Sequence, residues 1–489
     1  MSLTQVCDRE RGWSEVPLVK TWQLIAGSAV AGLALSVTAV AAAGPWDSGQ
    51  RKAERDRAAS WIVGGGADHA GGRAPQAAPS APGVLGAVGA GTGSGQAAAS
   101  SDGLAAALAP LLADRALGTV RTASVVDTAT GQVLYESGAR DAMTPASTVK
   151  IATAAAALAA LGPEHRIRTT VVPGTAPGQI VLVGGGDPSL TARKKAPAGS
   201  GGSLVALAAD TARALKAAGT ASVSLGYDDS LYTGPARHPI GVNPNIALVT
   251  ALTADEGRTD ESASGPVDRV EDPSGEAARA FAALLAERGV KVTGEPVRAR
   301  PAEGAQPLAT TRSTPLAGLV ERMLTNSDND IAEALARQTA LASGQPASFE
   351  GAEKAVAARL AGLGLDVAGS RFADGSGLAR ADKVSAGLLT GVLAKAAGPD
   401  HPELRPVLTG LPVAGFTGTL RSRNAGTSPA AGLLRAKTGT LTGVNSLAGT
   451  VVDPSGRLLA FAFLTANSPG AEGAEKGLDK LAAAVAATP

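Results

Sequence analysis

The chain of 489 residues contains few of the residue types on which several classes of site depend. Its one cysteine, Cys7, excludes an intramolecular disulfide and a cysteine-based metal cluster. The four histidines lie far apart and show no His-x-x-x-His or Glu-x-x-His spacing, so we do not expect a zinc hydrolase. We therefore predict an activity that needs neither a metal nor another cofactor.

Aromatic residues and an excess of charge of one sign are also scarce. Aromatic side chains make up 3% of the chain, so the core must consist mainly of alanine and aliphatic residues. Lys and Arg total 44 and Asp and Glu total 43, a balance that argues against nucleic acid as a partner. Hydrophobic residues, at 44%, are sufficient for a sizeable core, and the length suggests about three domains.

Residues 21–44 contain no charged side chain and are numerous enough to cross a bilayer as a helix. A cleaved signal peptide would end at Ala41-Ala42-Ala43. An uncleaved anchor fits the length better, because the apolar part of a signal peptide usually has about 7–15 residues. We expect an anchor after a leader at residues 1–20, and secretion after cleavage is the alternative. Basic residues flank both ends, so they do not decide the orientation.

The remaining chain divides into a spacer and a folded part. Residues 45–101 are mostly Gly, Ala, Ser and Pro, which is typical of a disordered linker. Residues 102–165 and 312–489 show helices, two hairpins and a closing helix, a pattern that favours an antiparallel sheet flanked by helices. Short Val-rich strands alternate with Ala-rich helices in residues 166–311. We predict an α+β domain that this α/β insertion interrupts.

Ser147-Thr148-Val149-Lys150 is the only Ser-x-x-Lys segment and begins a strongly apolar helix that ends at Leu161. A spacing of three residues places the serine hydroxyl and the lysine amine on one helix face. Burial disfavours the charged amine, and a neutral lysine can accept the proton of a nucleophilic serine. The alternative is a surface lysine beside a helix-capping serine, and this motif alone does not exclude it.

Two further motifs make a catalytic interpretation more specific. Ser327-Asp328-Asn329 falls between two predicted helices, and Lys437-Thr438-Gly439-Thr440 is predicted to end a strand. Alone, the first is weak, since its last two residues could merely cap a helix and Ser422-Arg423-Asn424 has the same spacing. In the order Ser-x-x-Lys, Ser-x-Asn and Lys-Thr-Gly, the three motifs are typical of class A β-lactamases and penicillin-binding proteins.

With these motifs the sequence resembles the D-alanyl-D-alanine carboxypeptidases of the class C, type-4 penicillin-binding protein family, in the serine β-lactamase and transpeptidase-like superfamily. Further matching segments, within residues 101–489, are 184–190, 228–235, 374–378, 411–415 and 418–420. The family usually carries a longer insertion with two subdomains. We therefore expect one inserted subdomain here, with at most a reduced second one.

The resemblance implies a penicillin-binding-protein/β-lactamase-like fold and a role for each motif residue. Ser147 is expected to attack the D-Ala-D-Ala peptide carbonyl, with Lys150 as its general base. Ser327 would relay a proton to the leaving amine. Asn329 would hold the substrate amide and contact the region of Lys150.

The third motif is implied to bind the end of the substrate. Lys437 would supply positive charge for catalysis and for the substrate carboxylate. The hydroxyl groups of Thr438 and Thr440 would bind that carboxylate beside Gly439. The backbone N–H groups of Ser147 and Thr440 are expected to form the oxyanion hole.

The implied function is that of a serine D-Ala-D-Ala carboxypeptidase acting on peptidoglycan stem peptides through an acyl-enzyme that β-lactams also form. Cleavage of peptide cross-links is an open second activity. A β-lactamase of the same superfamily and a catalytically silent penicillin-binding sensor are the alternatives. Because the substrate lies outside the cytoplasmic membrane, we expect an extracytoplasmic catalytic domain, with residues 1–20 in the cytoplasm.

We expect no catalytic role for the Asp374–Leu378 segment or for His238. The Asp374-Gly375-Ser376-Gly377-Leu378 segment has the composition of a turn, and we predict that its role is structural. His238 precedes a proline, and no serine lies in a Gly-x-Ser-x-Gly elbow, so a Ser-His-Asp triad is not expected.

Overall fold

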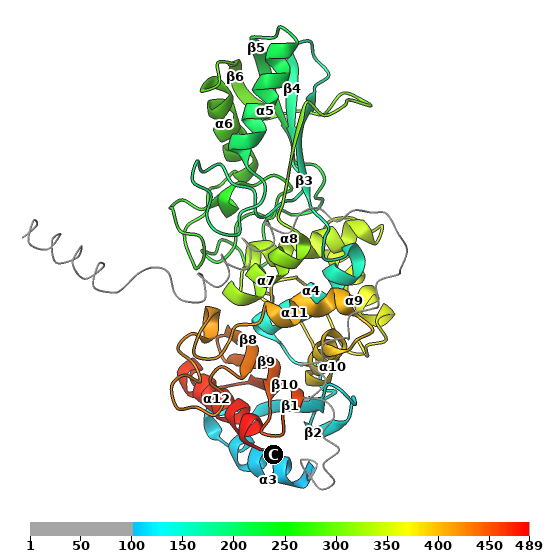
Figure 1. The fold of residues 1–489 in the computed structure, drawn as a ribbon, viewed down its shortest axis with the longest axis vertical. Helices are drawn as coiled ribbons and strands as arrows, with labels where there is room; N and C mark the ends of the chain where they lie inside the picture. Colours follow the sequence, from blue (N-terminus) through cyan, green and yellow to red (C-terminus); the bar gives the residue numbers. More distant parts are fainter. Residues whose placement is uncertain (1–100, 489) are drawn as a thin grey trace, which may run out of the picture. The chain divides into compact units, whose positions relative to one another are not determined.

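The computed structural model describes residues 101–488, which form two five-stranded sheets with their flanking helices (Figure 1). The first sheet has the order β2-β1-β10-β9-β8 and is antiparallel throughout. Its strands are β1 Val120–Asp127, β2 Val133–Ser137, β8 Leu434–Leu441, β9 Val444–Val452 and β10 Leu458–Ala466. Strands from both ends of the described chain therefore form the predicted antiparallel sheet.

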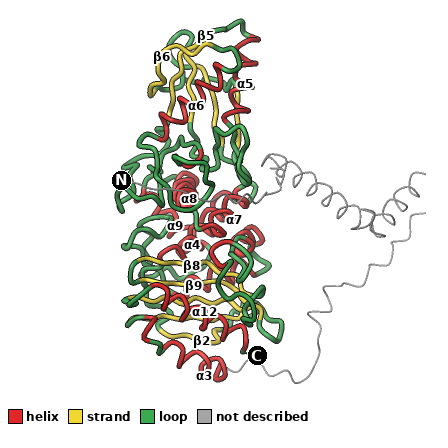
Figure 2. Tube along the Cα trace, turned by 90° about the vertical axis from the view of Figure 1, so that its left-hand side faces the viewer, coloured by secondary structure: helices red, strands yellow, loops and turns green. Residues whose placement is uncertain are grey.

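Alternating side chains give this sheet two apolar faces, as the pleat of a strand requires. In β10, Ala460, Ala462 and Leu464 belong to one core cluster, whereas Leu459, Phe461 and Phe463 belong to another. Figure 2 shows helices on both sides of the sheet. On the first face α10 Ala386–Ala397 packs against the strands, and its core cluster continues into α4 Val149–Leu161, α7 Leu316–Asn326, α8 Asn329–Ala342, α9 Phe349–Gly362 and α11 Arg405–Thr409. On the second face lie α3 Ser101–Leu112 and α12 Ala471–Ala487.

Helix α4 is the central helix of the first face. All its residues from Val149 to Leu158 are buried, and half of them are alanines, whose small side chains allow α8 and α9 to pack closely. A 3-10 turn at Ala146–Thr148 precedes the helix, and Gly162, with φ 80°, ends it. The start of α4 therefore lies between the sheet and the helices that follow the insert.

The insert contains a second, mixed sheet of order β6-β5-β4-β3-β7. Its elements are β3 Arg168–Pro173, β4 Gln179–Val183, α5 Leu204–Ala217, β5 Ser222–Asp228, α6 Pro273–Ala286, β6 Lys291–Arg298 and β7 Ala309–Arg312. The strands β4, β5 and β6 are parallel, and α5 and α6 supply the crossovers that parallel pairs need. Both helices pack against the sheet around Phe281.

A long connection between β5 and α6 spans residues 229–272 and contains only a short 3-10 turn at Asp255–Gly257. It contacts the start of α8, where the Asp330 carboxylate accepts a hydrogen bond from the Ala247 N–H group at 2.8 Å. The insert thus consists of one sheet domain and a loop-rich segment that reaches the other domain.

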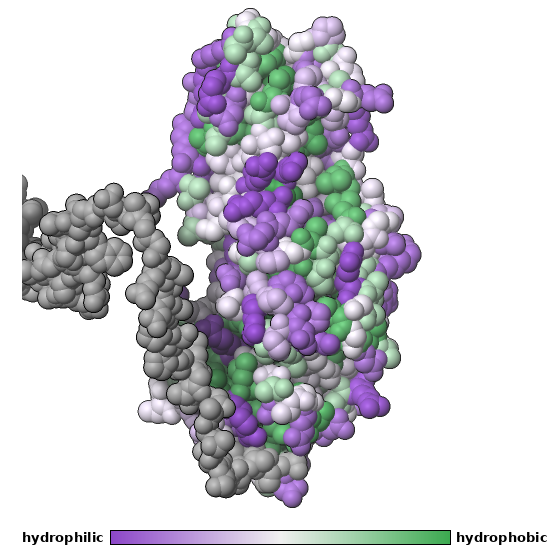
Figure 3. All heavy atoms as spheres, turned by 45° about the vertical axis from the view of Figure 1, so that its right-hand side comes forward, coloured by the Kyte–Doolittle hydropathy of each residue, from purple (hydrophilic) through white to green (hydrophobic). Residues whose placement is uncertain are grey.

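The predicted leader at residues 1–20 and anchor at residues 21–44 lie outside the described part of the chain. The predicted spacer at residues 45–101 does too, except for Ser101, which begins α3. Between Ser101 and Thr488, no helix has both the length and the apolar character that crossing a membrane requires. On the face in Figure 3, hydrophilic and apolar side chains are intermixed.

Candidate active site

Ser147 and Lys150 lie at the entrance to α4 with their functional atoms in contact. The Lys150 Nζ atom is 3.0 Å from the Ser147 Oγ atom. The Lys150 side chain is fully buried, whereas Ser147 is partly exposed and lines a cleft. The hydroxyl is therefore accessible to a substrate, and the amine lies behind it.

Three acceptors surround the Lys150 amine. Besides Ser147, they are the Asn329 Oδ1 atom at 2.7 Å and the Ser376 carbonyl oxygen at 2.5 Å. Burial lowers the pKa of Lys150 to about 8, although nearby carboxylates act in the opposite direction. These carboxylates belong to Asp374, Asp328, Glu333 and Asp382. With this pKa, roughly a tenth of the amine is neutral at pH 7 and can act as a base.

The Ser327-Asp328-Asn329 segment connects α7 to α8. Ser327 has a left-handed backbone, with φ 59°, which reverses the chain after α7. The Asp328 Oδ1 atom accepts the Ile331 N–H group at 3.0 Å and caps α8. Asn329 accepts from Lys150, and its Nδ2 atom donates to the Asn245 carbonyl of the insert at 3.0 Å. The amide of Asn329 is thus held from both sides.

The Lys437-Thr438-Gly439-Thr440 motif occupies the C-terminal part of edge strand β8, which continues for one more residue to Leu441, so the motif lies at the end of a strand as predicted. The strand continues because it pairs with β9 through Leu441. A Cβ atom on Gly439 would lie 2.2 Å from the Ser446 Oγ atom and 2.7 Å from the Pro145 carbonyl oxygen. Only glycine therefore allows β8 to approach the chain just before Ser147 this closely.

Lys437 is buried and donates to the neighbouring Thr438 carbonyl at 2.7 Å. Burial, and then the charges of Lys150 and Arg423, lower the pKa of Lys437 well below its usual value. A carboxylate arriving beside this amine would favour its charged form. Lys437 is thus close enough to Lys150 to affect its electrostatics, but its hydrogen bond lies along its own strand.

The hydroxyl groups of both threonines in this motif already make hydrogen bonds within the protein. The Thr438 Oγ1 atom donates to the Thr419 hydroxyl at 3.0 Å, and the Thr440 Oγ1 atom donates to Glu475 at 2.9 Å. Thr440 lines the same cleft as Ser147. Its hydroxyl would therefore have to turn away from Glu475 to bind a substrate carboxylate.

The cleft beside Ser147 has a volume of about 370 Å³, and residues of both the insert and the catalytic domain line it. Four predicted site residues line it, namely Ser147, Ser327, Asn329 and Thr440. The insert contributes Ile240, Asn243, Asn245, Arg258, Ser264, Gly265, Pro266 and Arg269. The site is therefore a groove that the insert walls on one side, with Lys150 and Lys437 buried behind its surface.

The Asp374–Leu378 turn supplies part of the site that our sequence analysis missed. The Ser376 carbonyl lies against Lys150, and Asp374 holds the turn by accepting the N–H groups of Ser376 at 2.9 Å and Gly377 at 2.5 Å. A Cβ atom on Gly377, which has φ 84°, would come within 2.0 Å of the Ala146 carbonyl oxygen. The glycine-rich composition indicated a turn, but not its contact with the lysine.

His238, Glu333 and Asp374 form a buried cluster next to this turn, and their ligand atoms lie within 4.8 Å of one another. Such a set could hold a cation. However, the His238 Nε2 atom lies 2.8 Å from Asp374, and its Nδ1 atom accepts the Ile240 N–H group at 3.1 Å. Glu333 accepts N–H groups from the turn. His238, Asp374 and one oxygen of Glu333 thus have hydrogen-bond partners. The other Glu333 oxygen lies 3.6 Å from the Arg337 guanidinium.

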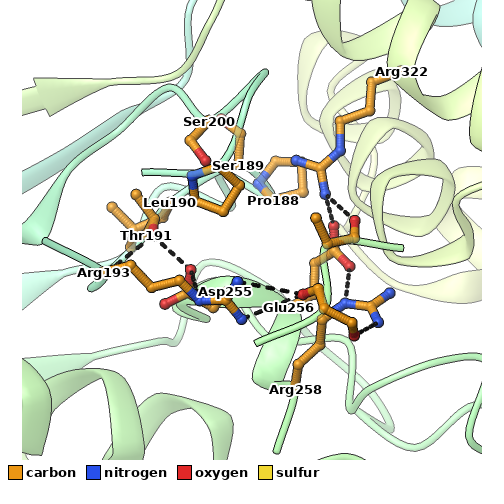
Figure 4. A pocket seen from close by; sticks show the side chains of 13 residues that line it. Pro188, Ser189, Leu190, Thr191, Arg193, Ser200, Asp255, Glu256, Arg258 and Arg322 are labelled. Atoms are coloured by element: carbon orange, nitrogen blue, oxygen red, sulfur yellow. Dashed lines mark hydrogen bonds and ion pairs between the residues drawn. The ribbon is translucent and has the colours of Figure 1, made fainter. Parts of the chain in front are cut away.

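Figure 4 shows a second cluster of charged side chains, in which Glu256 lies between Arg258 and Arg322. Glu256, in a left-handed conformation with φ 55°, pairs with Arg322 and, at 2.9 Å, with Arg258. Burial and then the charge of Asp328 raise the pKa of Glu256 to about 8. Arg322 also lies 3.5 Å from the Asp328 carboxylate. The insert is therefore connected to the motif that carries Ser327 and Asn329.

Most of the described chain is similar to known proteins. The family described as D-Ala-D-Ala carboxypeptidase 3 (S13) matches residues 104–264 and 258–487. Carboxypeptidase DacB of Mycolicibacterium smegmatis is 38% identical over 393 residues, covering 78% of this chain and 83% of that protein. Carboxypeptidase Rv3627c of Mycobacterium tuberculosis is 39% identical over 396 residues, with 78% and 83% covered.

The fold is also similar to a solved structure. Penicillin-binding protein 4 (dacB) from Haemophilus influenzae aligns with a TM-score of 0.62 and 22% identity, over 78% of this chain and 97% of that one. This likeness, together with the antiparallel sheet and its helices, confirms the predicted α+β fold. The chain belongs to the D-Ala-D-Ala carboxypeptidase 3 (S13) family, and the predicted serine-type D-Ala-D-Ala carboxypeptidase is confirmed as its enzyme class.

Proposed function

We propose that the protein removes the terminal D-alanine of peptidoglycan stem peptides through an acyl-enzyme on Ser147. The observation that carries this proposal is the 3.0 Å contact between the accessible Ser147 hydroxyl and the buried Lys150 amine. Because the pKa of that amine is lowered to about 8, it can accept a proton near neutral pH.

In the first step, neutral Lys150 takes the proton of Ser147 while the Oγ atom attacks the D-Ala-D-Ala carbonyl carbon. The carbonyl electron pair moves onto its oxygen, and the backbone N–H groups of Ser147 and Thr440 stabilise that oxyanion. When the carbonyl re-forms, the C–N bond breaks, and Ser327 passes a proton to the leaving amine of D-alanine. Protonated Lys150 returns its proton to Ser327. Water then attacks the ester carbonyl carbon and gives a proton to neutral Lys150, which passes it to the Ser147 Oγ atom as the ester C–O bond breaks.

The segment from Lys437 to Thr440 is proposed to bind the terminal carboxylate of the substrate. Thr440 lines the cleft, and the fully buried Lys437 lies on the same strand. A carboxylate placed there would favour the charged form of Lys437 and would exchange one hydrogen bond, between Thr440 and Glu475, for another. The enzyme is therefore expected to prefer peptides with a free C-terminal carboxylate.

β-Lactams are proposed to acylate the same serine, since their amide also presents a carbonyl carbon to the Ser147 hydroxyl. The cleft is open to solvent, and a branched peptide could enter it. We therefore propose cleavage of peptide cross-links as a second activity. The two alternative functions differ in the fate of the acyl-enzyme. A β-lactamase would turn over the β-lactam rapidly, and a silent sensor would release no D-alanine.

We further propose that residues 21–44 anchor the chain in the cytoplasmic membrane, with the catalytic domain outside it. The uncharged stretch in the sequence and the extracytoplasmic position of peptidoglycan support this proposal. Protease treatment of intact cells should remove the catalytic domain, and the cell-bound protein should keep its original N-terminus. A mature N-terminus at Gly44 would instead indicate secretion after cleavage.

The main test measures D-alanine release from pentapeptides containing lysine or diaminopimelate, together with the covalent adduct formed by a labelled penicillin. We expect release by the wild-type protein, a long-lived adduct on Ser147, and loss of both in Ser147→Ala. Ser222→Ala, which changes an exposed serine of β5, serves as the matched control. A folded wild-type protein that takes up no label and releases no D-alanine would contradict the proposal.

A further inference from the structure

His238 belongs to the loop-rich segment of the insert, yet its ring is buried against the catalytic domain. The His238 side chain is 1% exposed, and its Nε2 atom lies 2.8 Å from the Asp374 Oδ2 atom. Its Nδ1 atom accepts the Ile240 N–H group, so Nε2 carries the proton and donates to Asp374. The edge of the ring also packs against Phe349 of α9, with centroids 5.3 Å apart. Both ring nitrogens of His238 thus have defined partners.

The acceptor of this hydrogen bond organises the turn beside Lys150. Through its two oxygens, Asp374 accepts the N–H groups of Ser376, Gly377 and Ala379. Burial acts to raise the pKa of Asp374, but hydrogen bonding to His238 and the other partners lowers it to about 2. The adjacent Asp382 has its pKa raised to about 10, first by burial and then by the Asp374 charge. Asp374 is therefore the carboxylate whose charge the surrounding donors stabilise.

The turn that Asp374 holds is packed directly against the catalytic residues. The Ser376 carbonyl oxygen is 2.5 Å from the Lys150 Nζ atom and 3.5 Å from the Ser147 Oγ atom. The neighbouring Gly375 carbonyl accepts the Thr153 hydroxyl of α4 at 2.8 Å. A shift of this turn would therefore change the geometry of the base and the nucleophile together.

We propose that His238 is a positioning residue, through which the insert fixes the Asp374–Leu378 turn and thereby the base Lys150. This inference rests on the proposed function, because it assigns Lys150 the role of base for Ser147. His238 does not itself line the cleft, and its hydrogen bond to Asp374 leads to Lys150, so loss of that bond acts on the chemical step. Its other hydrogen bond holds Ile240, which lines the cleft. The insert accordingly contributes to catalysis as well as to the wall of the groove.

Two substitutions at the same position separate the two hydrogen bonds of the imidazole. The amide nitrogen of glutamine can occupy the place of Nε2, so His238→Gln keeps the donor to Asp374 and loses the acceptor for Ile240. The shorter side chain of His238→Asn can keep the acceptor for Ile240 but cannot reach Asp374. A merely structural role of the buried ring would make both variants equally defective.

We expect His238→Asn to lower kcat for D-alanine release and the rate of acylation by labelled penicillin by about 10- to 100-fold, with KM little changed. His238→Gln should stay within about threefold of the wild type. Tyr232→Phe is the matched control, since Tyr232 is another insert residue, partly buried, whose hydroxyl lies 3.4 Å from the Ala334 carbonyl of α8. Its loss should leave kcat unchanged.

The outcomes distinguish this inference from the proposed function. Equal rates in His238→Asn and the wild type, or equal losses in the Asn and Gln variants, would overturn the positioning role while leaving the proposed function in place. A wild-type protein that is not acylated would overturn both. Circular dichroism and thermal unfolding establish that each variant is folded. If His238→Asn does not fold, a loss of kcat in folded His238→Gln would itself contradict the inference.

Discussion

Two fully buried lysines, Lys150 at the start of α4 and Lys437 in β8, have opposite surroundings. The Lys150 amine contacts acceptors from three segments of the chain and lies near four carboxylates. The Lys437 amine donates to the next carbonyl of its own strand, and the charges that affect it most are those of Lys150 and Arg423. The motif spacing alone does not reveal this difference.

The proposed function gives the two amines different steps, and the difference in their surroundings supports that proposal. Burial lowers the pKa of both lysines, but carboxylates hold the pKa of Lys150 at about 8, where proton transfer in either direction is accessible. Lys437 lacks such compensation and has its pKa lowered further. A substrate carboxylate would supply the missing negative charge. Lys150 is thus suited to move protons, and Lys437 to recognise an anion.

Replacing Lys150 by arginine should produce the largest effect. Arginine keeps a positive charge but cannot be deprotonated in a protein, so Lys150→Arg should slow acylation by labelled penicillin about 10³-fold or more. Lys437→Arg is the matched control, because it makes the same exchange at the lysine assigned to anion binding. Should the two variants lose activity equally, or should Lys150→Arg stay within tenfold of the wild type, the assignment of the base is wrong.

Replacing Lys437 by methionine should have a smaller and substrate-dependent effect. Removing the cation costs the charged hydrogen bond to the substrate carboxylate, about 1.5–3 kcal/mol, so kcat/KM for an acyl-D-Ala-D-Ala peptide should fall about 10- to 100-fold. The same peptide with an amidated C-terminus should lose much less. An equal loss for both peptides would mean that Lys437 does not recognise the carboxylate.

Replacing Ser327 by glycine separates the contribution of its hydroxyl to activity from the cost of its left-handed backbone to stability. Because φ is 59°, Ser327→Gly should relieve about 1 kcal/mol of strain and raise the melting temperature, while D-alanine release falls about tenfold through loss of the proton relay. Ser422→Ala, in the other Ser-x-Asn segment, should leave activity unchanged. Full activity of Ser327→Gly would remove this serine from the mechanism.

The smallest predicted effect concerns pH. The Asp328 charge raises the pKa of Lys150, so Asp328→Asn should lower it while keeping the cap of α8. More neutral amine is then present at low pH, and the acidic limb of the acylation rate should move to lower pH. The ratio of the acylation rate at pH 6 to the rate at the alkaline plateau should be higher in Asp328→Asn than in the wild type, by less than about tenfold. A shift of the limb to higher pH would contradict the electrostatic account of Lys150.

Sequence analysis anticipated the parts of the site that depend on local spacing. Ser147 and Lys150 meet because they are three residues apart at a helix start, and Asp328 caps α8 as its position suggested. The segment from Lys437 to Thr440 was predicted to end a strand, and β8 ends one residue later, at Leu441, where its pairing with β9 stops. β5 and α10 were not predicted, although β5 lies between two parallel strands and α10 packs against the first sheet. Strand pairing and packing of this kind are not encoded locally.

The contacts between the insert and the catalytic domain could not be predicted from one sequence. His238 and Asp374 are 136 positions apart, and a histidine before a proline carries no signal for a buried partner. Asn245 supports Asn329 through a backbone carbonyl, which any residue could supply. Glu256 has a positive φ, a backbone conformation that is usually predicted only for glycine. Tertiary packing imposes each of these arrangements.

The central claim is that a buried, partly neutral Lys150 deprotonates Ser147. It is tested most directly by the pH dependence of the second-order rate of acylation by labelled penicillin, in the wild type and in Lys150→Arg. The account predicts that the wild-type rate rises about tenfold per pH unit and levels off near pH 8, and that this limb is absent in Lys150→Arg. A wild-type rate that still rises above pH 10, or an unchanged limb in the variant, would contradict it.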